Sequence, residues 1–211
     1  MQIVSPHAEL LTIIDKNDFL QVIERAGRTC YKSEEKITID SAESFVKKLI
    51  EREHEAMLEH APSISMKFVC DRGVSHEIVR HRLFSFAQES TRYCNYSGDK
   101  FGSEITVIKP LFLTEGAMDY RYWKDACETA EINYLKMLNY GRSAQEARSV
   151  LPNSLKTEII VTGNIREWRH FFKLRTAPAA HPQMQEVAKM ALRILKDKVS
   201  IVFDDIEKTA N

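Results

Sequence analysis

Hydrophobic residues recur at helical spacing in five segments of the chain. They predict amphipathic helices over residues 18–26, 41–53, 115–140, 165–174 and 184–195. Before the second segment, Asp40 can cap the helix and Glu43 can close a capping box. After the third, Gly141 stands where a left-handed residue commonly ends a helix. The long third helix is therefore expected to end there, with one face in the core.

Alternation of apolar and polar residues marks a different kind of segment. Residues 63–71 (SISMKFVCD) alternate in this way and predict a half-buried strand that ends at Asp71-Arg72-Gly73. Further short elements are expected as strands over residues 2–4 and 157–162, and as helices over residues 74–81 and from Ser143 to Leu151. Helices with few, well-separated strands predict a single α+β domain over residues 1–211, with a small antiparallel or mixed sheet flanked by several helices, including long amphipathic ones.

The composition is that of an ordinary globular protein. Of the 211 residues, 44% are hydrophobic and 28% are charged. Lysine plus arginine equals aspartate plus glutamate at 30 each, so no net field draws the chain to nucleic acid or to an anionic membrane. The first residues lack the basic and apolar regions of a signal peptide, and no apolar run approaches the roughly 18 residues of a spanning helix. A cytoplasmic protein without nucleic-acid or membrane partners is expected.

The stretch RHRLFSFAQESTRY, residues 80–93, concentrates the candidate chemistry. Arg80, His81 and Arg82 are consecutive, and side chains on a helix point about 100° apart, so these three fit better at a helix end, where they can surround a ligand. Ser90 and Arg92 are two residues apart, and in an extended segment both would point to one side. A hydroxyl beside a guanidinium suits a phosphate.

Other arginines lie far away in the sequence. They are Arg148, before the Leu-Pro break, and Arg166, Arg169 and Arg175, on the helix of residues 165–174 or at its end. If they converge, the site binds a ligand with several anionic groups. The alternative is that each is solvated or paired with a neighbouring glutamate, as arginines on helices commonly are.

Several familiar catalytic and metal motifs are absent or wrongly spaced. HEIVRH (residues 76–81) is similar to the HExxH of zinc proteases, but its second histidine lies about 140° from the first on a helix, and the histidines of HEAMLEH (54–60) are six apart. No GxGxxG or P-loop pattern occurs, and Ser90 lacks the G-x-S-x-G elbow. The four cysteines show no C-x-x-C spacing and are interpreted as reduced thiols. No metal is expected.

At the basic stretch the chain resembles the flavin-dependent thymidylate synthases, whose pattern is Arg-His-Arg, seven residues and then Ser. Here it reads Arg80-His81-Arg82, LFSFAQE and Ser90, followed by Arg92 and Tyr93. Further elements follow in the family's order: HEAMLEH (54–60) upstream, then ARSVLP (147–152), NIREWRHFFKLR (164–175) and AHPQM (180–184). The resemblance extends from about residue 30 to residue 191.

The resemblance implies an enzyme that makes thymidylate from deoxyuridylate (dUMP). The methylene comes from 5,10-methylenetetrahydrofolate and the hydride from FAD, which NADPH reduces. The family is a homotetramer with active sites shared between subunits. Because the hydride chemistry belongs to the flavin, no enzyme cysteine nucleophile is required.

The resemblance also implies site residues. For dUMP they are His76, Glu77, Ile78, Val79, Arg80, Gln88, Glu89, Ser90, Thr91, Arg92, Arg148 and Arg175, with the segment from Gln88 to Arg92 supplied by another subunit. For FAD they are Ala56, Arg80, His81, Arg82, Gln88, Asn164, Ile165, Arg166 and His170, with Cys30, His54, Glu59 and His181 as further candidates. Arg175 is the expected catalytic residue, because a permanent cation stabilises negative charge that develops on the pyrimidine.

The sequence departs from the family's pattern at a few positions. Many relatives have Asn-Glu in place of Ala87-Gln88, Gln in place of Glu77 and Ser in place of Cys30. The first two changes bear on the polar contacts to flavin and nucleotide. The third exchanges a hydroxyl for a thiol.

Two other classes of protein remain open at this point. One is a non-catalytic binding module for nucleotides or single-stranded nucleic acid, with Tyr93, Tyr96 and Trp168 as stacking platforms beside the arginines. The neutral net charge argues against it. The other is a purely structural oligomer, which leaves the Ser-x-Arg pair unexplained.

Overall fold

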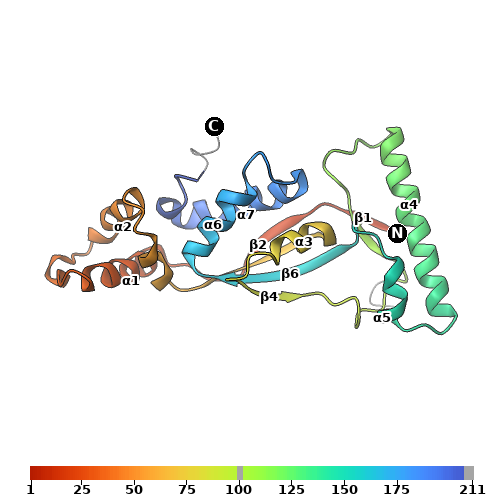
Figure 1. Cartoon of the computed structure of the whole chain (residues 1–211), viewed down its shortest axis with the longest axis horizontal. Coiled ribbons are helices and arrows are strands. Elements are labelled where there is room, and N and C mark those ends of the chain that lie inside the picture. The colour runs from red at the N-terminus through yellow and green to blue at the C-terminus, as the bar shows by residue number, and fades with distance from the viewer. Residues whose placement is uncertain (99–101, 207–211) are drawn as a thin grey trace. The chain divides into compact units, whose positions relative to one another are not determined.

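The computed structural model describes residues 1–98 and 102–206 and has a mixed α+β fold (Figure 1). Its α-helices are α1 (Lys16–Thr29), α2 (Ser41–Glu51), α3 (Arg72–Ile78), α4 (Met118–Asn139), α5 (Ala144–Ala147), α6 (Ile165–Arg175) and α7 (Pro182–Val199). Short 3₁₀ helices are η1 (Glu34–Lys36), η2 (Glu55–His60), η4 (Arg148–Val150) and η5 (Ser200–Val202). In these described ranges no helix has both the length and the apolar character needed to cross a membrane.

The strands form two small sheets. They are β1 (Gln2–Val4), β2 (His7–Leu10), β3 (Ile64–Asp71), β4 (Ser85–Gln88), β5 (Thr106–Ile108) and β6 (Lys156–Gly163). β1 pairs in parallel with β5, and the other four strands form a sheet in the order β2-β3-β6-β4. Small sheets with long amphipathic helices confirm the predicted α+β class.

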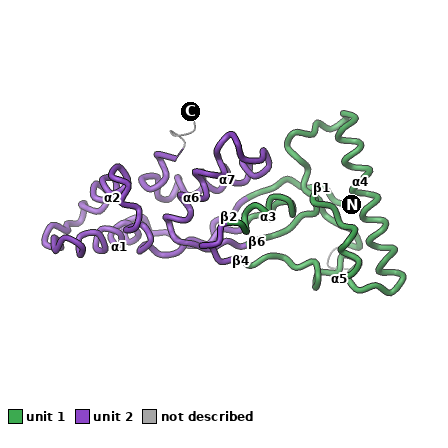
Figure 2. Tube along the Cα trace, viewed as in Figure 1, with its two compact units in different colours: residues 1–7, 68–80, 87–159 green, residues 8–67, 81–86, 160–211 purple. Residues whose placement is uncertain are grey.

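The chain divides into two compact units (Figure 2). The first unit comprises residues 1–7, 68–80 and 87–159, and the second comprises residues 8–67, 81–86 and 160–211. Each strand of the four-stranded sheet contributes residues to both units. The expectation of one domain over the whole chain stays a prediction.

The core of the first unit forms where α4 and α5 pack with the β5 segment. Its buried members are Tyr96, Ile105, Val107, Cys127, Tyr134, Ala147 and Leu155. The Tyr134 hydroxyl accepts a hydrogen bond from the Tyr96 backbone N–H at 3.3 Å, and the Trp123 indole donates to the Ser154 hydroxyl at 2.8 Å. Only Cys127 and Tyr134 of α4 are buried, so the predicted core face of this helix is narrower than its apolar pattern.

The core of the second unit is built around α6. Trp168, Phe171 and Phe172 are completely buried there, and the Trp168 indole donates to the carbonyl of Ile64 at 3.1 Å. The rings of Trp168 and Phe172 are stacked, with centroids 5.6 Å apart. α7 adds Met184, Val187, Ala188, Ala191, Leu192 and Leu195 to this core. Aromatic burial therefore fixes the helix that follows β6.

All five predicted long segments form helices, but details at their ends differ. Gly141 has φ +85° and its N–H donates to the carbonyl of Leu138 at 2.9 Å, which confirms the predicted end of α4. The predicted capping box at α2 is wrong. Asp40 makes no side-chain cap bond, and Glu43 accepts a hydrogen bond from Lys16 at 2.8 Å instead of closing the box.

The predicted break at Asp71-Arg72-Gly73 is the start of a helix. The Asp71 carboxylate accepts a hydrogen bond from the N–H of Val74 at 2.8 Å, so α3 follows β3 without a loop. Strands β2, β4 and β5 were not expected, because each is only three or four residues long and two of them show little burial.

Gly163 allows a close approach between the last residue of β6 and the ring of Phe84. A Cβ at Gly163 would overlap that ring, which packs 4.6 Å from the ring of Trp168. Phe84 lies in the basic stretch, two residues after Arg82, and Gly163 precedes α6. The absence of a side chain at this glycine therefore lets the two candidate segments of the second unit pack together.

We expect Gly163→Ala to lower the free energy of unfolding by about 1–3 kcal/mol, because overfilling a packed site forces ring and backbone to shift. Gly98→Ala is the matched control, since among the described residues its Cβ would meet only the Asn95 carbonyl oxygen, at 3.5 Å. Urea unfolding followed by circular dichroism measures both changes. Equal stability of the two variants would contradict the role assigned to Gly163.

Candidate active site

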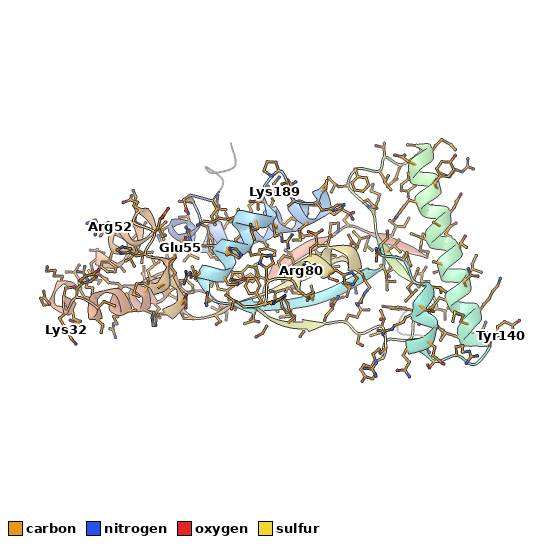
Figure 3. The ribbon with its side chains drawn as sticks, in the orientation of Figure 1. Lys32, Arg52, Glu55, Arg80, Tyr140 and Lys189 are labelled. Atoms are coloured by element: carbon orange, nitrogen blue, oxygen red, sulfur yellow. The ribbon has the colours of Figure 1, made fainter. Side chains whose placement is uncertain are left out.

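The basic stretch lies near a helix end, but the helix predicted over residues 74–81 ends earlier, before Arg80. α3 ends at Ile78, and Arg80 follows in the first unit with an exposed side chain (Figure 3). His81 and Arg82 belong to the second unit. His81 is 5% exposed, whereas Arg82 is exposed. The three bases therefore do not share one environment.

The segment from Gln88 to Arg92 is not extended throughout, which corrects the expectation for Ser90 and Arg92. β4 ends at Gln88, and a turn follows in which the N–H groups of Tyr93 and Cys94 donate to the Ser90 carbonyl at 3.1 and 2.9 Å. The Ser90 hydroxyl accepts from the Arg92 N–H at 3.3 Å. A serine hydroxyl that accepts a hydrogen bond from a backbone N–H two residues later favours a turn over a strand.

Buried contacts hold both sides of this turn in the first unit. The Gln88 amide donates to the hydroxyls of Ser75 and Thr157 at 2.9 and 3.2 Å. The Glu89 carboxylate accepts from the Tyr96 hydroxyl and from Lys156, both at 3.1 Å. Gln88 and Glu89 therefore anchor the turn through their side chains.

A cationic pocket of about 230 Å³ lies in the first unit. Its lining residues among residues 1–98 and 102–206 are Arg72, His76, Thr91, Arg148, Ser149, Leu151, Pro152, Asn153 and Leu155, and these include no carboxylate. Arg148 donates to the Thr91 hydroxyl at 3.3 Å. The structure thus brings together His76, Thr91 and Arg148, three of the residues predicted for the nucleotide.

Arg72 is a lining residue that the sequence did not suggest. It was interpreted as part of a break after β3, although it begins α3 and donates to the Glu89 carbonyl at 3.4 Å and to the Thr157 hydroxyl at 3.5 Å. The signal that could have found it is the Asp71 cap, which predicts a helix that starts at the arginine.

Of the other residues predicted for dUMP, Ile78 is fully buried and Val79 is 38% exposed.

A larger pocket of about 540 Å³ lies in the second unit. It is lined by Glu55, Glu59, Leu83, Asn164, Arg166, Glu167 and His170. Asn164 caps α6 by accepting from the Glu167 N–H at 2.9 Å, and Arg166 donates to Glu59 at 2.6 Å. The pocket gathers Glu59, Asn164, Arg166 and His170 from the residues predicted for FAD. Ile165, also predicted for FAD, is fully buried and is not among these lining residues.

An apolar pocket of about 290 Å³ in the second unit holds the remaining upstream candidates. It is lined by Gly27, Cys30, Tyr31, Leu49, His54, Ala56 and Met57. The Cys30 thiol lies 4.0 Å from the Met57 sulfur. Cys30, His54 and Ala56, predicted from separate parts of the sequence, thus share one hollow. His181 is the exposed N-cap residue of α7.

Arg175 ends α6 and is held by an imidazole. Its Nε donates to His81 Nε2 at 3.0 Å. Burial lowers the pKa of His81 to about 4, and electrostatic interactions with Arg175 and His170 add to this effect. A neutral imidazole can accept the hydrogen bond, so the predicted catalytic guanidinium has a defined orientation.

Arg169 anchors α6 through buried ion pairs. It is 1% exposed and donates two bonds to Glu55, at 3.2 and 3.0 Å, and two to Asp205, both at 2.7 Å. Glu55 projects from η2 beside α6 (Figure 3) and also accepts from Lys173 at 2.9 Å. Burial alone would raise the pKa of Glu55, but the hydrogen bonds and charges of Lys173 and Arg169 outweigh it and lower the pKa.

Other features bear on the alternatives. Trp168 is completely buried and Tyr96 is 4% exposed, so neither can serve as the stacking platform that a nucleic-acid module needs. The four cysteines are free thiols. Across residues 1–98 and 102–206, no group of three histidine, cysteine or acidic side chains is arranged to hold a metal ion.

Fold and pockets together define an α+β protein with a carboxylate-free cationic pocket and a separate pocket of the size that holds a cofactor. The family model described as thymidylate synthase complementing protein matches residues 12–199. The chain belongs to the flavin-dependent thymidylate synthase family.

Individual relatives cover most of the chain. The flavin-dependent thymidylate synthase of Corynebacterium aurimucosum is 33% identical, over 89% of this chain and 80% of the relative. That of Geobacter sulfurreducens is 35% identical, over 85% and 78%. Among solved structures, a UMP/dUMP methylase, PolB, from Streptomyces cacaoi bound with 5-Br dUMP shares the fold, with a TM-score of 0.81 at 23% identity over 100% of this chain and 98% of that one.

Arg169 and Arg166 form a matched pair for a stability test, because each binds a glutamate of η2. Arg169→Met leaves carboxylates without their buried partner, and we expect a loss of about 2–4 kcal/mol in the free energy of unfolding. Arg166 and Glu59 are 51% and 44% exposed. Arg166→Met should therefore cost less than about 1 kcal/mol. Urea unfolding measures both; similar losses would show that burial does not set the strength of these pairs.

Proposed function

We propose that this protein catalyses the reductive methylation of dUMP to thymidylate. In this proposal 5,10-methylenetetrahydrofolate gives the carbon, and FAD reduced by NADPH gives the hydride. The single observation that carries the proposal is the family match over residues 12–199, which includes the residues of both candidate pockets. The fold shared with a UMP/dUMP methylase supports it.

The cationic pocket of the first unit suits the nucleotide phosphate. Arg72 and Arg148 supply two permanent positive charges, and Thr91 and Ser149 supply hydroxyls. The lining residues in the described part of the chain include no carboxylate, so these residues attract an anion without a competing negative charge among them. We assign the phosphate of dUMP to this pocket and add Arg72 to the residues that hold it.

The larger pocket of the second unit fits FAD by its size and donors. A volume of about 540 Å³ lies within the usual range of cofactor sites, about 300–1,000 Å³. Asn164, Arg166 and His170 offer polar groups along its wall, and the negative charges of Glu59 and Glu55 are compensated by arginine or lysine. When bound, FAD supplies the hydride transfer, and the residues named here bind and orient it.

Arg175 is assigned to the pyrimidine. Uracil becomes a nucleophile at C5 only as negative charge develops over its ring, and a guanidinium stabilises this charge without exchanging a proton. Arg175 is half-buried, so its charge is less screened by water than that of a surface arginine. Its orientation by His81 fixes the direction from which the charge acts.

The cysteines agree with chemistry that uses no enzyme thiolate. Burial raises the pKa of the Cys70 thiol and the pKa of the Cys127 thiol, so both are held in the protonated form. A protonated buried thiol is a poor nucleophile. This supports a mechanism in which carbon transfer proceeds without a covalent bond from cysteine to the pyrimidine.

Further parts of the proposal concern assembly and location. We assign the protein to the cytoplasm as a single domain that assembles into a homotetramer, with the segment from Gln88 to Arg92 entering a neighbouring subunit's site. The anchored turn supports this role, because Gln88 and Glu89 hold a shape that can be presented to a partner. No nucleic acid or membrane is among the proposed partners.

The test of the function begins with the visible absorption of the purified protein. A flavin spectrum should bleach when NADPH is added without oxygen in the presence of dUMP. Adding 5,10-methylenetetrahydrofolate should then yield thymidylate, measured by chromatography. The proposal would be overturned if the protein is colourless and does not bind added FAD. It would also be overturned if the protein binds single-stranded nucleic acid with steep salt dependence.

Arg175→Ala and Arg148→Met should change different kinetic constants, kcat in the first case and KM in the second. Arg175→Ala should keep FAD and lose about 10²–10³-fold in kcat, as expected for a group that stabilises developing charge. Arg148→Met should raise the KM for dUMP by about 10-fold or more, because a charge-assisted bond is lost in the ground state as well. Steady-state kinetics on the FAD-loaded proteins separates the two; a change in KM alone for both variants would contradict the assignment of Arg175.

A further inference from the structure

Three residues of α6 lie on one face of the helix at intervals of four. Glu167, Phe171 and Arg175 occupy positions i, i+4 and i+8, so the first and last are about 12 Å apart along the axis. Glu167 is 5% exposed, Phe171 is completely buried and Arg175 is half-buried. A buried carboxyl group two turns from the predicted catalytic arginine needs a polar partner.

The imidazole of His81 fills the space between the two polar ends of this row. Its Nδ1 lies 3.4 Å from Glu167 Oε1, and its Nε2 lies 3.0 Å from Arg175 Nε. The ring contacts Phe171 edge to face at 5.0 Å and His170 at 5.7 Å. One side chain from the basic stretch therefore joins the carboxyl group and the guanidinium.

The direction of the bond to Arg175 assigns the hydrogen on His81. Arginine Nε–H can only donate, so His81 Nε2 must carry the lone pair. A neutral imidazole with a bare Nε2 has its hydrogen on Nδ1, the atom that faces Glu167. Burial and the charges of Arg175 and His170 lower the pKa of His81 to about 4, so the neutral form is present at pH 7.

We infer that Glu167 is a positioning residue for Arg175 and acts through His81. Its carboxyl group holds the hydrogen of the imidazole on Nδ1, and the bare Nε2 of that tautomer holds the guanidinium by its Nε–H. The inference rests on the proposed function, in which Arg175 acts on the pyrimidine.

Loss of the carboxyl group would weaken the preference for this tautomer, which the bond from Arg175 alone would then have to hold. Burial raises the pKa of Glu167, but both of its ionisation states keep an oxygen that can accept a hydrogen bond from Nδ1–H. With no acceptor beside Nδ1, the hydrogen can move to Nε2, where it would face the Nε–H of Arg175. Two donors repel, so the guanidinium would turn away from its position.

Two substitutions separate this role from others. Glu167→Leu removes the acceptor, whereas Glu167→Gln keeps a carbonyl oxygen at the same distance along the side chain. We expect Glu167→Leu to lower kcat about 10–100-fold, the size of effect seen when a group that orients an active-site ligand is removed. The KM for dUMP should stay near that of the wild type. Because Glu167 also lines the pocket assigned to FAD, kcat is compared at saturating FAD. Glu167→Gln should restore kcat to within about 3-fold of the wild type.

Glu24→Gln is the control for loss of a buried carboxylate in the same unit. Glu24 is completely buried and accepts from Arg28 and Ser41, both at 2.8 Å. This variant should lower the melting temperature and leave kcat unchanged. A wild-type kcat in Glu167→Leu would overturn the inference. Equal loss of FAD and kcat in the Leu and Gln variants would overturn it as well, since it would place Glu167 on the cofactor itself.

A second readout does not depend on turnover. In FAD-loaded protein labelled with ¹⁵N-histidine, solid-state NMR distinguishes the two tautomers, and the His81 signal is the one that disappears in His81→Asn. The wild type should show hydrogen on Nδ1, and Glu167→Leu should move it to Nε2. Hydrogen on Nε2 in the wild type would overturn the inference even if thymidylate is formed. If no thymidylate is formed but the tautomers behave as expected, the positioning chain stands and the proposed function fails.

Discussion

A guanidinium that is 1% exposed must have its charge and its donors satisfied within the protein, and the placement of α6 depends on this condition. Arg169 meets it with Glu55, Asp205 and the Val202 carbonyl. These partners come from η2 and from the chain around η5, so the helix cannot shift without leaving charges unpaired in the interior. Aromatic packing by Trp168 and Phe171 resists the same movement.

Because α6 is held in this way, its other faces can carry polar and charged side chains whose burial costs free energy. Arg166 and His170 are exposed and line the larger pocket. Glu167 lines the same pocket, and both Glu167 and Arg175 meet His81. The energy of the aromatic core and of the Arg169 pairs offsets the desolvation of these polar groups. One helix therefore serves both purposes: Arg169 and the aromatic side chains stabilise the fold, and other residues of α6 form the candidate site.

Much of this arrangement is readable in the sequence. The apolar periodicity predicts every long helix, and the Arg-His-Arg pattern points to the α3 end and to the chain after it. Sequence spacing fails where a side chain bonds its own backbone: Ser90 and Arg92 lie in a turn, and Arg72 begins a helix that looked like a break. Glu167 was missed because its partner, His81, lies far away in sequence. Only the i, i+4, i+8 row of Glu167, Phe171 and Arg175 hinted at a shared face.

In the second unit Arg175 carries the positive charge, and His81 orients it through a hydrogen bond. Arginine keeps its proton at any pH that a protein tolerates, so the protein can tune Arg175 only by orienting it and by limiting its access to water. A protonated imidazole could not accept the Arg175 bond. Burial of His81 therefore turns the residue best suited to proton exchange into a fixed acceptor. The low pKa of His81 thus secures the direction of a positive charge, and it points to a site where electrostatic placement, rather than acid–base transfer by this histidine, is what the fold provides.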